Sequence, residues 1–336
     1  MNRLLFVSTV IISCLALLSF QEARQLNFKI QGEAQGTTYQ ISYYHKEEKV
    51  TKNEIDSILE LIDQSMSLYR PNSLISQINR SKKGMKLDPH FLNVMKNAFK
   101  INEDTHGIFD VTVEPLLSTW GFSSTKTDSL PTKEKIDELL PLVGMDKIKI
   151  KGKHLVKKRP EILINVNGIA QGYTVDVLAD FLRCKGIRDF FIELGGEIKA
   201  EGQKPDHSLF TIGIEGPLKD KPDQVGIKHL VSLDNKALTT SGGYNQFVEK
   251  NGKKYIHILD PKTGFPIESD ILSVTILADN AVTADGYDNA VMAMGMRRAL
   301  EFIEDRPSID AYIVYQKPDG TVLDTMTNGL KAIIKN

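Results

Sequence analysis

The segment Ala284–Ala290 carries the most specific arrangement of chemistry-bearing side chains in this sequence. In a helix, Asp285, Asp288 and Asn289 would bring their oxygens together near one face of one turn, because they follow i, i+3 and i+4 spacing. Carboxylate and amide oxygens without His or Cys suit Mg²⁺ or Ca²⁺ better than zinc. The alternative is that acidic residues at a helix N-terminus only complement the helix dipole. The spacing indicates a candidate site for a hard divalent cation and leaves the simpler interpretation open.

Turns dense in glycine and small polar residues form a second group of candidates. Glycine costs backbone entropy, so this density is unexpected if packing alone were at stake. Glycines with hydroxyl neighbours let backbone N–H groups approach a phosphate closely, and a turn that leads from a strand into a helix places an anion at the helix N-terminus. Taken singly, each is more simply explained as a structural turn. The segments are Gly36–Tyr39, Asn165–Gly172 (expected to join a strand to a helix), Glu193–Gly196, Thr239–Gly243 and His257–Gly264.

Common catalytic signatures are missing from the sequence. It contains no Gly-rich dinucleotide fingerprint, Walker loop, His-Glu-x-x-His or Gly-x-Ser-x-Gly motif. The 7 histidines do not fall at the helical spacing of a metal pair. A nicotinamide dehydrogenase, a P-loop enzyme and a zinc protease are therefore disfavoured, and spacing alone explains His257 most simply as a structural strand residue.

The elements that must position these groups mix helices and strands without a regular βαβ alternation, which predicts an α+β fold with largely antiparallel sheets. Thr51 with Glu54 forms a capping box, and Asp88 followed by Pro89 is a helix start. We expect strands at 36–44, within 146–166 and within 189–279, helices at 51–69, 88–106, from about 132, 173–185 and 283–294, and hairpin turns at Asn251-Gly252 and Pro318–Gly320.

Composition is that of an ordinary folded chain. The sequence has 336 residues, 41% of them hydrophobic and 25% charged, with a formal net charge of -1. This balance offers no electrostatic reason to expect a nucleic-acid partner. The 2 cysteines exclude a disulfide framework, and Cys184, on an apolar-patterned helix, is expected to be a small core residue.

Residues 1–23 resemble an export signal or a single N-terminal membrane anchor. A basic start at Arg3 precedes the uncharged, mainly apolar run Leu4–Phe20. Ile11–Cys14 is also similar to a bacterial lipobox, although the apolar run continues beyond Cys14. Lipidation, ordinary cleavage and an uncleaved anchor all remain open, and each places residues 25–336 outside the cytoplasm.

The ordered motifs of the remaining chain resemble those of the ApbE family, the FAD:protein FMN transferases, over roughly residues 32–330. Gln35 stands where the family has Met, Asn165 where Asp is frequent, Gln171 where Lys is frequent, and Asn289 where many members have Thr. The matching segments are Gly36–Tyr39, Met66–Ser73, Phe109–Leu116, Trp120–Phe122, Asn165–Gly172, the paired glycines, His257–Gly264, and Ala284-Asp285 before Gly295.

This resemblance implies a single large α+β domain over residues 25–336 and a Mg²⁺-dependent transfer of FMN from FAD. The acceptor would be a Thr or Ser hydroxyl of a flavoprotein, a subunit of a membrane redox complex or an extracytoplasmic electron carrier, with a phosphoester formed and AMP released. It implies an enzyme tethered to the bacterial membrane, by an N-terminal anchor or lipid, that faces the periplasm. The alternatives are a Mg²⁺-dependent FAD pyrophosphatase and a non-catalytic FAD-binding carrier.

The resemblance also carries over site residues. Asp285 and Asn289 would ligate the metal through side chains, with Asp288 a further candidate ligand and Gly168 a backbone one. His257 would take the proton from the acceptor hydroxyl, as a neutral imidazole can near pH 7. Tyr69 is a candidate to stack on a flat ring of the cofactor. The positions that match the FAD site are Gln35, Tyr69, Ile108, Phe109, Asp110, Asn165, Gln171 and Leu259.

Overall fold

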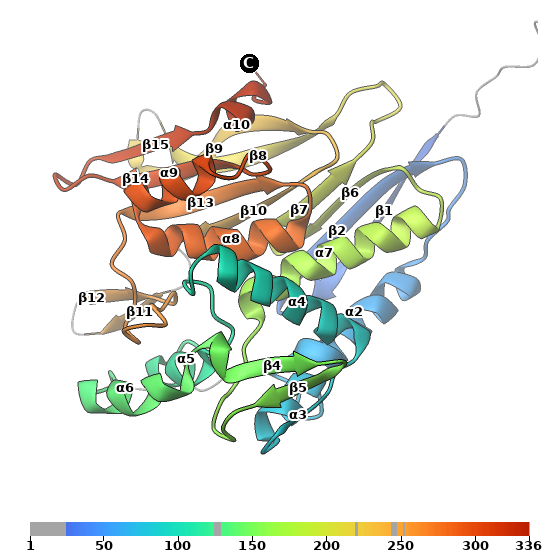
Figure 1. Ribbon diagram of the computed structural model, residues 1–336. Helices are drawn as coiled ribbons and strands as arrows, with labels where there is room; N and C mark the ends of the chain where they lie inside the picture. The colour runs from blue at the N-terminus through green and yellow to red at the C-terminus, as the bar shows by residue number, and fades with distance from the viewer. Residues whose placement is uncertain (1–24, 124–128, 219–220, 243–246, 251–252, 336) are drawn as a thin grey trace, which may run out of the picture.

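A large antiparallel sheet forms the centre of the molecule (Figure 1). The computed structural model describes residues 25–123, 129–218, 221–242, 247–250 and 253–335. Within these residues every strand pairing is antiparallel, which confirms the predicted α+β class. Across the 8-stranded sheet the order is β1 (Leu26–Ala34), β2 (Thr37–His45), β6 (Asp189–Leu194), β7 (Glu197–Glu201), β10 (Lys236–Gly242), β13 (Ile271–Ala278), β14 (Asp310–Gln316) and β15 (Val322–Met326).

Two helices, α7 (Asn167–Cys184) and α8 (Ala281–Met294), cover one face of this sheet, and the ribbon of β8 (Phe210–Leu218) and β9 (Lys221–Leu233) covers the other (Figure 1). Successive side chains of β10 point to opposite faces of the sheet, as strand geometry requires. Ala237 belongs to the hydrophobic cluster that contains residues of α7, and Leu238 belongs to the cluster that contains Val231 of β9. The chain therefore places the end of β10 between a helical layer and a β-ribbon.

The remaining elements lie around this core. α2 (Lys52–Met66) and α4 (Pro89–Asp104) pack against α7, and α4 also packs against α8. The others are α3 (Leu74–Arg80), α5 (Glu114–Trp120), α6 (Lys133–Leu139), α9 (Met296–Glu304), α10 (Asn328–Ala332), the short helices η1 (Leu140–Leu142) and η2 (Met145–Lys147), the small sheet of β3 (Gly84–Lys86), β5 (His154–Lys157) and β4 (Ile148–Lys151), and the pair β11 (Phe247–Lys250) and β12 (Lys253–Ile256).

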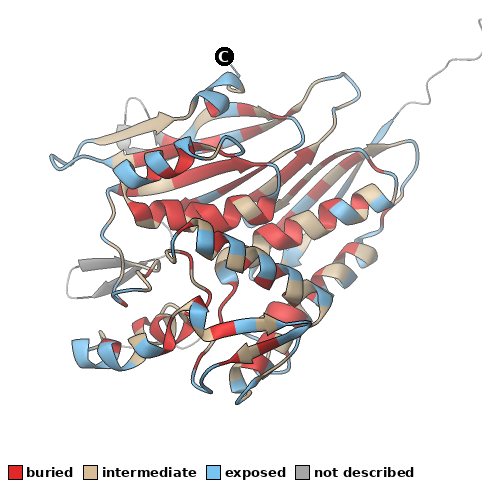
Figure 2. Ribbon diagram, viewed as in Figure 1, coloured by how far each residue is buried: buried red, intermediate tan, exposed pale blue. Residues whose placement is uncertain are grey.

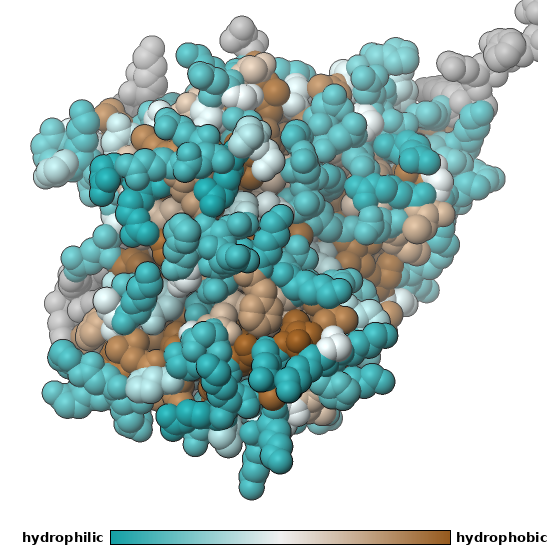
Figure 3. All heavy atoms as spheres, in the orientation of Figure 1, coloured by the Kyte–Doolittle hydropathy of each residue, from teal (hydrophilic) through white to brown (hydrophobic). Residues whose placement is uncertain are grey.

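Burial is concentrated in the sheet and in α8, whereas α6 is largely exposed (Figure 2). The face seen in Figure 3 is mostly hydrophilic, with apolar side chains gathered in its lower half. The close approach of α7 to α8 depends on Gly172. A Cβ there would lie 2.4 Å from the Ala281 carbonyl oxygen and 2.6 Å from the Asp285 Cβ, so any side chain would separate the two helices.

Local helix signals are confirmed where the sequence carries them. The Thr51–Glu54 capping box is formed, and Asp88 caps α4 with Pro89 at its start. Gly295, at φ 73, ends α8. The Pro318–Gly320 hairpin joins β14 to β15. These features succeed because they depend on neighbours within one turn of chain.

Several expectations are wrong. α7 begins at Asn167 rather than at 173, no strand leads into it, and Thr239–Gly242 lies in strand β10 rather than in a turn. The sequence patterns do not predict β1. Cys184 is exposed rather than in the core, because it lies one turn after the exposed Asp180, on the side of α7 opposite the buried Leu182.

Some expectations concern residues that the structure does not describe. The Asn251-Gly252 turn and the N-terminal segment 1–23 with Cys14 lie outside the described residues. A search of the described residues finds no helix that is both long and apolar enough to span a bilayer.

Candidate active site

A single large cavity gathers the predicted site residues. Its volume is about 1310 Å³, and it lies at the end of the sheet where the β1–β2 and β6–β7 turns meet the start of α7. The size exceeds the range of roughly 300–1,000 Å³ that is typical of small-molecule pockets. Among its lining residues are Gln35, Tyr69, Ile108, Phe109, Asp110, Asn165, Gly168, Gln171, His257, Leu259, Asp285, Asp288 and Asn289, which include every predicted site residue.

The candidate metal residues of α8 are held by hydrogen bonds from two elements. The Gly172 N–H of α7 donates to Asp285 Oδ2 at 2.8 Å. The Thr239 hydroxyl of β10 donates to Asp288 Oδ2 at 2.9 Å, and the Ser241 hydroxyl donates to Asn289 Oδ1 at 3.1 Å. The Asn289 amide in turn donates to Asp288 Oδ1 at 3.0 Å. The predicted i, i+3, i+4 spacing thus does bring these oxygens onto one turn.

Helix α8 is anchored so that its first turn has no unsatisfied backbone donor. The carboxylate of Asp176 on α7 accepts from Ala281 N at 2.9 Å and from Val282 N at 2.8 Å. Asn280, the N-cap, accepts from Thr283 N and from Ala284 N. Because the first four N–H groups of a helix lack intrahelical partners, this arrangement fixes the helix that carries Asp285.

Electrostatics make this cluster unusual. Burial raises the pKa of Asp285 to about 7. Burial and the neighbouring Asp285 raise the pKa of Asp288 well above its usual range. Glu197 of β7 is also buried, and its pKa is raised well above the usual range by burial and by both aspartates. Three carboxylates thus share a buried region in which a bound cation would relieve their mutual repulsion.

The donor set fits a hard cation through mixed oxygen ligands. Among the described residues, no three His, Cys, Asp or Glu side chains are gathered closely enough to hold a metal by themselves. The predicted set differs, because it combines carboxylates with the Asn289 amide and a backbone carbonyl. Gly168 lies close to Asn289, whose Nδ2 is 3.7 Å from the position of a Gly168 Cβ, and Gly168 departs from helical geometry with ψ 19. Oxygen ligands of this kind are those that Mg²⁺ and Ca²⁺ take.

The segment that contains His257 forms a compact loop after β12. The Gly264 N–H donates to the Asp260 carbonyl, and Leu259 forms an isolated bridge with Pro266. The Trp120 indole N–H of α5 donates to the Gly264 carbonyl at 2.8 Å, which ties this loop to the α5 region. His257 is half-buried and lines the cavity with Leu259.

Among the residues that the resemblance assigns to the FAD site, some are exposed to the cavity and others are held by hydrogen bonds within the protein. Tyr69 is 71% exposed, and an exposed aromatic ring beside a cavity is available for stacking. In contrast, the Asp110 carboxylate is occupied by Thr112 N, Thr112 Oγ1 and Met145 N. Burial raises the pKa of Asp110 despite these bonds. Asp110 therefore shapes the loop, and Ile108 and Phe109 line the cavity beside it.

Two amide side chains, Asn165 and Gln171, lie in the cavity wall. Asn165 is buried, donates to Glu114 Oε2 at 2.6 Å and accepts from Asn167 N at 2.8 Å. Gln171 lies beside the β6–β7 turn, where its Nε2 is 2.8 Å from the position of a Gly195 Cβ.

Gln35 is the only one of the four non-glycine residues at positive φ that lines the cavity in the described chain. Its φ is 53, its Nε2 donates to the Thr174 hydroxyl at 2.8 Å, and its Oε1 is buried with no hydrogen-bond partner among the described residues. An unpaired buried carbonyl beside a cavity is available to a donor group on a ligand.

Sequence reasoning does not identify Glu114 or Glu197, although Glu197 directly follows the paired glycines Gly195-Gly196. It does include Thr239 and Ser241 among the candidates for phosphate contact, but it predicts a turn there instead of strand β10. Their alternation in the sequence is the period of a strand face, and that signal could have placed both hydroxyls on one side of β10.

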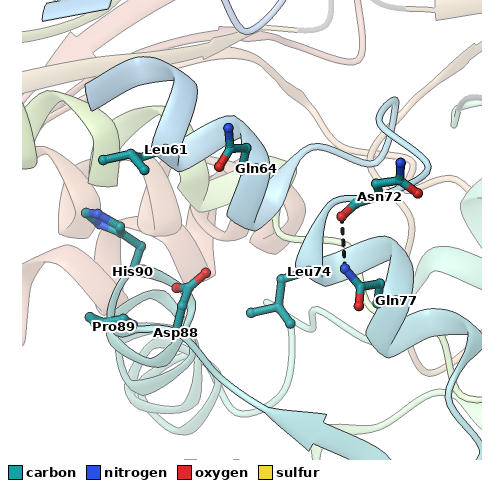
Figure 4. Close-up of a pocket in the computed structure, with 8 residues that line it drawn as sticks. All are labelled: Leu61, Gln64, Asn72, Leu74, Gln77, Asp88, Pro89 and His90. Carbon is teal, nitrogen blue, oxygen red and sulfur yellow. Dashed lines mark hydrogen bonds between the residues drawn. The ribbon is translucent and has the colours of Figure 1, made fainter. Parts of the chain in front are cut away.

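A smaller groove of about 600 Å³ lies on another surface, between α2, α3 and the start of α4 (Figure 4). Its polar groups serve local structure. The Gln77 amide donates to the Asn72 carbonyl at 2.9 Å, Asp88 caps α4, and His90 Nδ1 lies 3.0 Å from the Tyr173 hydroxyl. None of the predicted site residues lines it.

Comparisons with known proteins agree with this site. The chain matches the ApbE family over residues 35–313. It is 34% identical over 318 residues to an FAD:protein FMN transferase of Vibrio cholerae, with 93% of this chain and 94% of the relative covered. It is 30% identical over 335 residues to the Haemophilus influenzae protein of the same name, with 96% of each covered.

Solved structures show the same similarity. The flavin transferase ApbE from Vibrio cholerae superposes with a TM-score of 0.83 at 32% identity, covering 92% of this chain and 99% of that one. The apo form of the Pseudomonas stutzeri flavinyl transferase ApbE also gives 0.83, at 31% identity, covering 94% and 98%.

Proposed function

This chain belongs to the ApbE family and is a flavin transferase, and we propose that it moves FMN from FAD to a Thr or Ser hydroxyl of an extracytoplasmic flavoprotein. The observation that carries this proposal is the cavity in which the α8 carboxylates, His257 and the exposed Tyr69 lie together. The products are an FMN phosphoester on the acceptor and AMP.

The proposed roles follow from position and chemistry. Asp285, Asn289 and the Gly168 carbonyl would hold the cation, and Asp288 would be a further ligand or would orient Asn289. When bound, a divalent cation neutralises charge on the phosphate oxygens as the diphosphate bond breaks. Tyr69 stacks on a flat ring of FAD. The remaining walls of the FAD site are Gln35, Ile108, Phe109, Asp110, Asn165, Gln171 and Leu259.

The reaction is a substitution at the phosphorus of the FMN half. The acceptor oxygen forms a bond to that phosphorus, the bond from phosphorus to the bridging oxygen breaks, and AMP leaves with that oxygen. His257 accepts the proton of the hydroxyl, and its task is suited to an imidazole that is neutral near pH 7. Positioning and electrostatic stabilisation supply most of the rate enhancement in transfers of this type.

We also propose a location outside the cytoplasm, with the protein tethered to the membrane through residues 1–23. The support is the sequence alone: a basic start, an apolar run, and a lipobox-like Cys14. Mass spectrometry of the mature N-terminus tests this, and an intact Met1 in a soluble fraction would contradict it.

The test of function uses the full chain in detergent with FAD, Mg²⁺ and an extracytoplasmic flavoprotein domain that carries an acceptor Thr. We expect AMP release and an FMN-sized gain in acceptor mass. Free FMN with AMP and an unmodified acceptor would indicate a pyrophosphatase instead, and bound FAD without products would indicate a carrier.

A further inference from the structure

Strand β10 extends further along one neighbour than along the other. Its pairing with β13 runs from Ala237 to Gly242, whereas its pairing with β7 covers only Lys236–Leu238. β7 begins at Glu197, directly after the Gly195–Gly196 turn, so the ladder between β7 and β10 does not continue along Thr239–Gly242. In the part of the chain that the structure describes, no strand pairs with Thr239–Gly242 on the β7 side.

The ladder alternation shows which backbone groups face this open edge. Gly195 N donates to the Thr38 carbonyl at 3.1 Å, so Gly195 belongs to the residues of that hairpin that bond toward β2. Because the direction of the backbone hydrogen bonds alternates along each strand, Leu194 bonds toward β7, and Ile198 of β7 bonds toward β10. Leu238, the partner of Ile198, therefore bonds toward β7, and Thr240 and Gly242 direct their N–H and C=O groups to the same side. Thr239 and Ser241 bond toward β13.

A side-chain contact supports this assignment. The Thr240 and Thr275 hydroxyl oxygens of directly opposite residues are 2.8 Å apart, as expected for the closer, non-hydrogen-bonded pairs of an antiparallel ladder. Unpaired backbone donors and acceptors that line a cavity are a template for another strand. Both Thr240 and Gly242 line the cavity.

The two faces of this edge differ in chemistry. Thr239 and Ser241 point to the α8 face, where their hydroxyls donate to Asp288 and Asn289. Thr240 points to the opposite face, on which β8 lies, and Gly213 and Gly216 of β8 line the cavity. A strand added here would alternate its side chains between these two faces. A residue placed opposite Thr239 or Ser241 would therefore point toward the carboxylate cluster.

One wall of the cavity contains none of the residues proposed for the FAD site. The FAD positions lie on the β1–β2 turn, the loops after α2 and α4, the start of α7 and the His257 loop, whereas Gly195, Gly196 and Thr240–Gly242 form the sheet side. On that side, Glu197 is buried and its Oε2 has no hydrogen-bond partner among the described residues. A buried, unpaired carboxylate oxygen is a group that an incoming N–H or O–H can satisfy.

We propose that the acceptor protein docks as an extended segment, added as a β-strand to the open edge of β10 at Thr239–Gly242. Its hydroxyl residue lies opposite Thr239 or Ser241 and points to the α8 carboxylates. This inference rests on the proposed transfer to a Thr or Ser hydroxyl and names how the partner is recognised. Main-chain hydrogen bonds to Thr240 and Gly242 supply affinity, and the alternation of side chains selects which residue reaches the phosphorus.

The first test removes one edge donor. Proline at position 240 eliminates an N–H that faces the open edge and leaves the β13 ladder bonds intact. We expect Thr240→Pro to lower kcat/KM for the acceptor domain by about tenfold or more. The FAD dissociation constant is measured in the same variant, so that damage to the donor site is recognised.

Two controls isolate the edge from its surroundings. Val322→Pro puts proline at an outward-facing N–H of β15, the far edge of the same sheet, and Thr275→Val removes the hydroxyl partner of Thr240. Both should transfer within about twofold of the wild type. Transfer by folded Thr240→Pro within twofold of the wild type would overturn the proposal.

A second measurement needs no variant of the enzyme. Hydrogen exchange at single-residue resolution is followed on the full chain with FAD, with and without an acceptor domain whose Thr is changed to Val. We expect exchange of the Thr240 and Gly242 amides to slow about tenfold or more, with no change at Val322 on the far edge. Unchanged Thr240 and Gly242 exchange at saturating acceptor would overturn the strand-addition proposal. Absence of transfer by the wild type would instead contradict the proposed function.

Discussion

The carboxylates of α8 are enclosed by the core, whereas Tyr69, in the wall of the same cavity, is 71% exposed. Asp285 is 4% exposed and is held by the backbone of α7, and its helix is anchored by Asp176 and Asn280. Tyr69 belongs to a short loop between α2 and α3. The difference teaches that the proposed cation end of the site is preorganised by packing, and that the proposed flavin end is left open for a ligand to complete.

The largest effect is expected at the enclosed end. Asp285→Ala removes a candidate ligand from the buried carboxylate cluster that it forms with Asp288 and Glu197. We expect transfer to fall by about 10³-fold, because charge neutralisation at the phosphates is lost. The initial rate of AMP release at saturating FAD and Mg²⁺ measures this, and a rate near that of the wild type would refute the metal assignment.

His257 also lines this cavity and is half-buried in its loop. We expect His257→Ala to reduce flavin transfer to the acceptor by about 10²-fold, the low end of the contribution of a general base. FAD binding, followed by flavin fluorescence, should persist, because the imidazole acts on the acceptor hydroxyl. Flavinylation at the wild-type rate would show that another group takes the proton.

Asp176 tests whether anchoring of α8 sets cation affinity. Asp176→Ala leaves Ala281 N and Val282 N without acceptors, and we expect Mg²⁺ affinity to weaken by about tenfold, as for residues that orient metal ligands. Isothermal titration with Mg²⁺ measures the affinity directly. Asp180→Ala is the matched control on α7, because Asp180 is exposed and forms an ion pair with Arg183 instead of accepting from the first turn of α8. Equal affinities in the two variants would show that packing alone holds the helix.

The smallest effect is expected at the open end. Tyr69→Ala should weaken FAD binding by about fivefold, since one stacked aromatic ring contributes about 1 kcal/mol. The FAD dissociation constant, measured by fluorescence quenching, checks this. A loss as large as that of Asp285→Ala in transfer rate would mean that the two ends are not built differently.

Much of the helical framework could be predicted because its signals are local. Thr51 and Glu54 specify the start of α2, and Asp88 with Pro89 specifies the start of α4. The spacing of Asp285 and Asn289 likewise follows from the helix alone. The start of α7 could not be found in this way, since Asn165 is fixed by Glu114, 51 positions away in the chain. The sequence predicts a turn at the end of β10, because small polar residues are typical of turns, whereas in the structure Thr239 and Ser241 donate to Asp288 and Asn289.

By itself, the sequence determined the α+β class, the order of the family motifs and the residue types of the candidate site, because these depend on composition and short spacings. The tertiary structure alone decided that the Gly172 N–H donates to Asp285 and that Glu197 lies near the two aspartates. It also decided that β10 extends beyond its pairing with β7 at the cavity. The physical reason is that burial, carboxylate repulsion and unpaired backbone groups arise only when distant segments pack together.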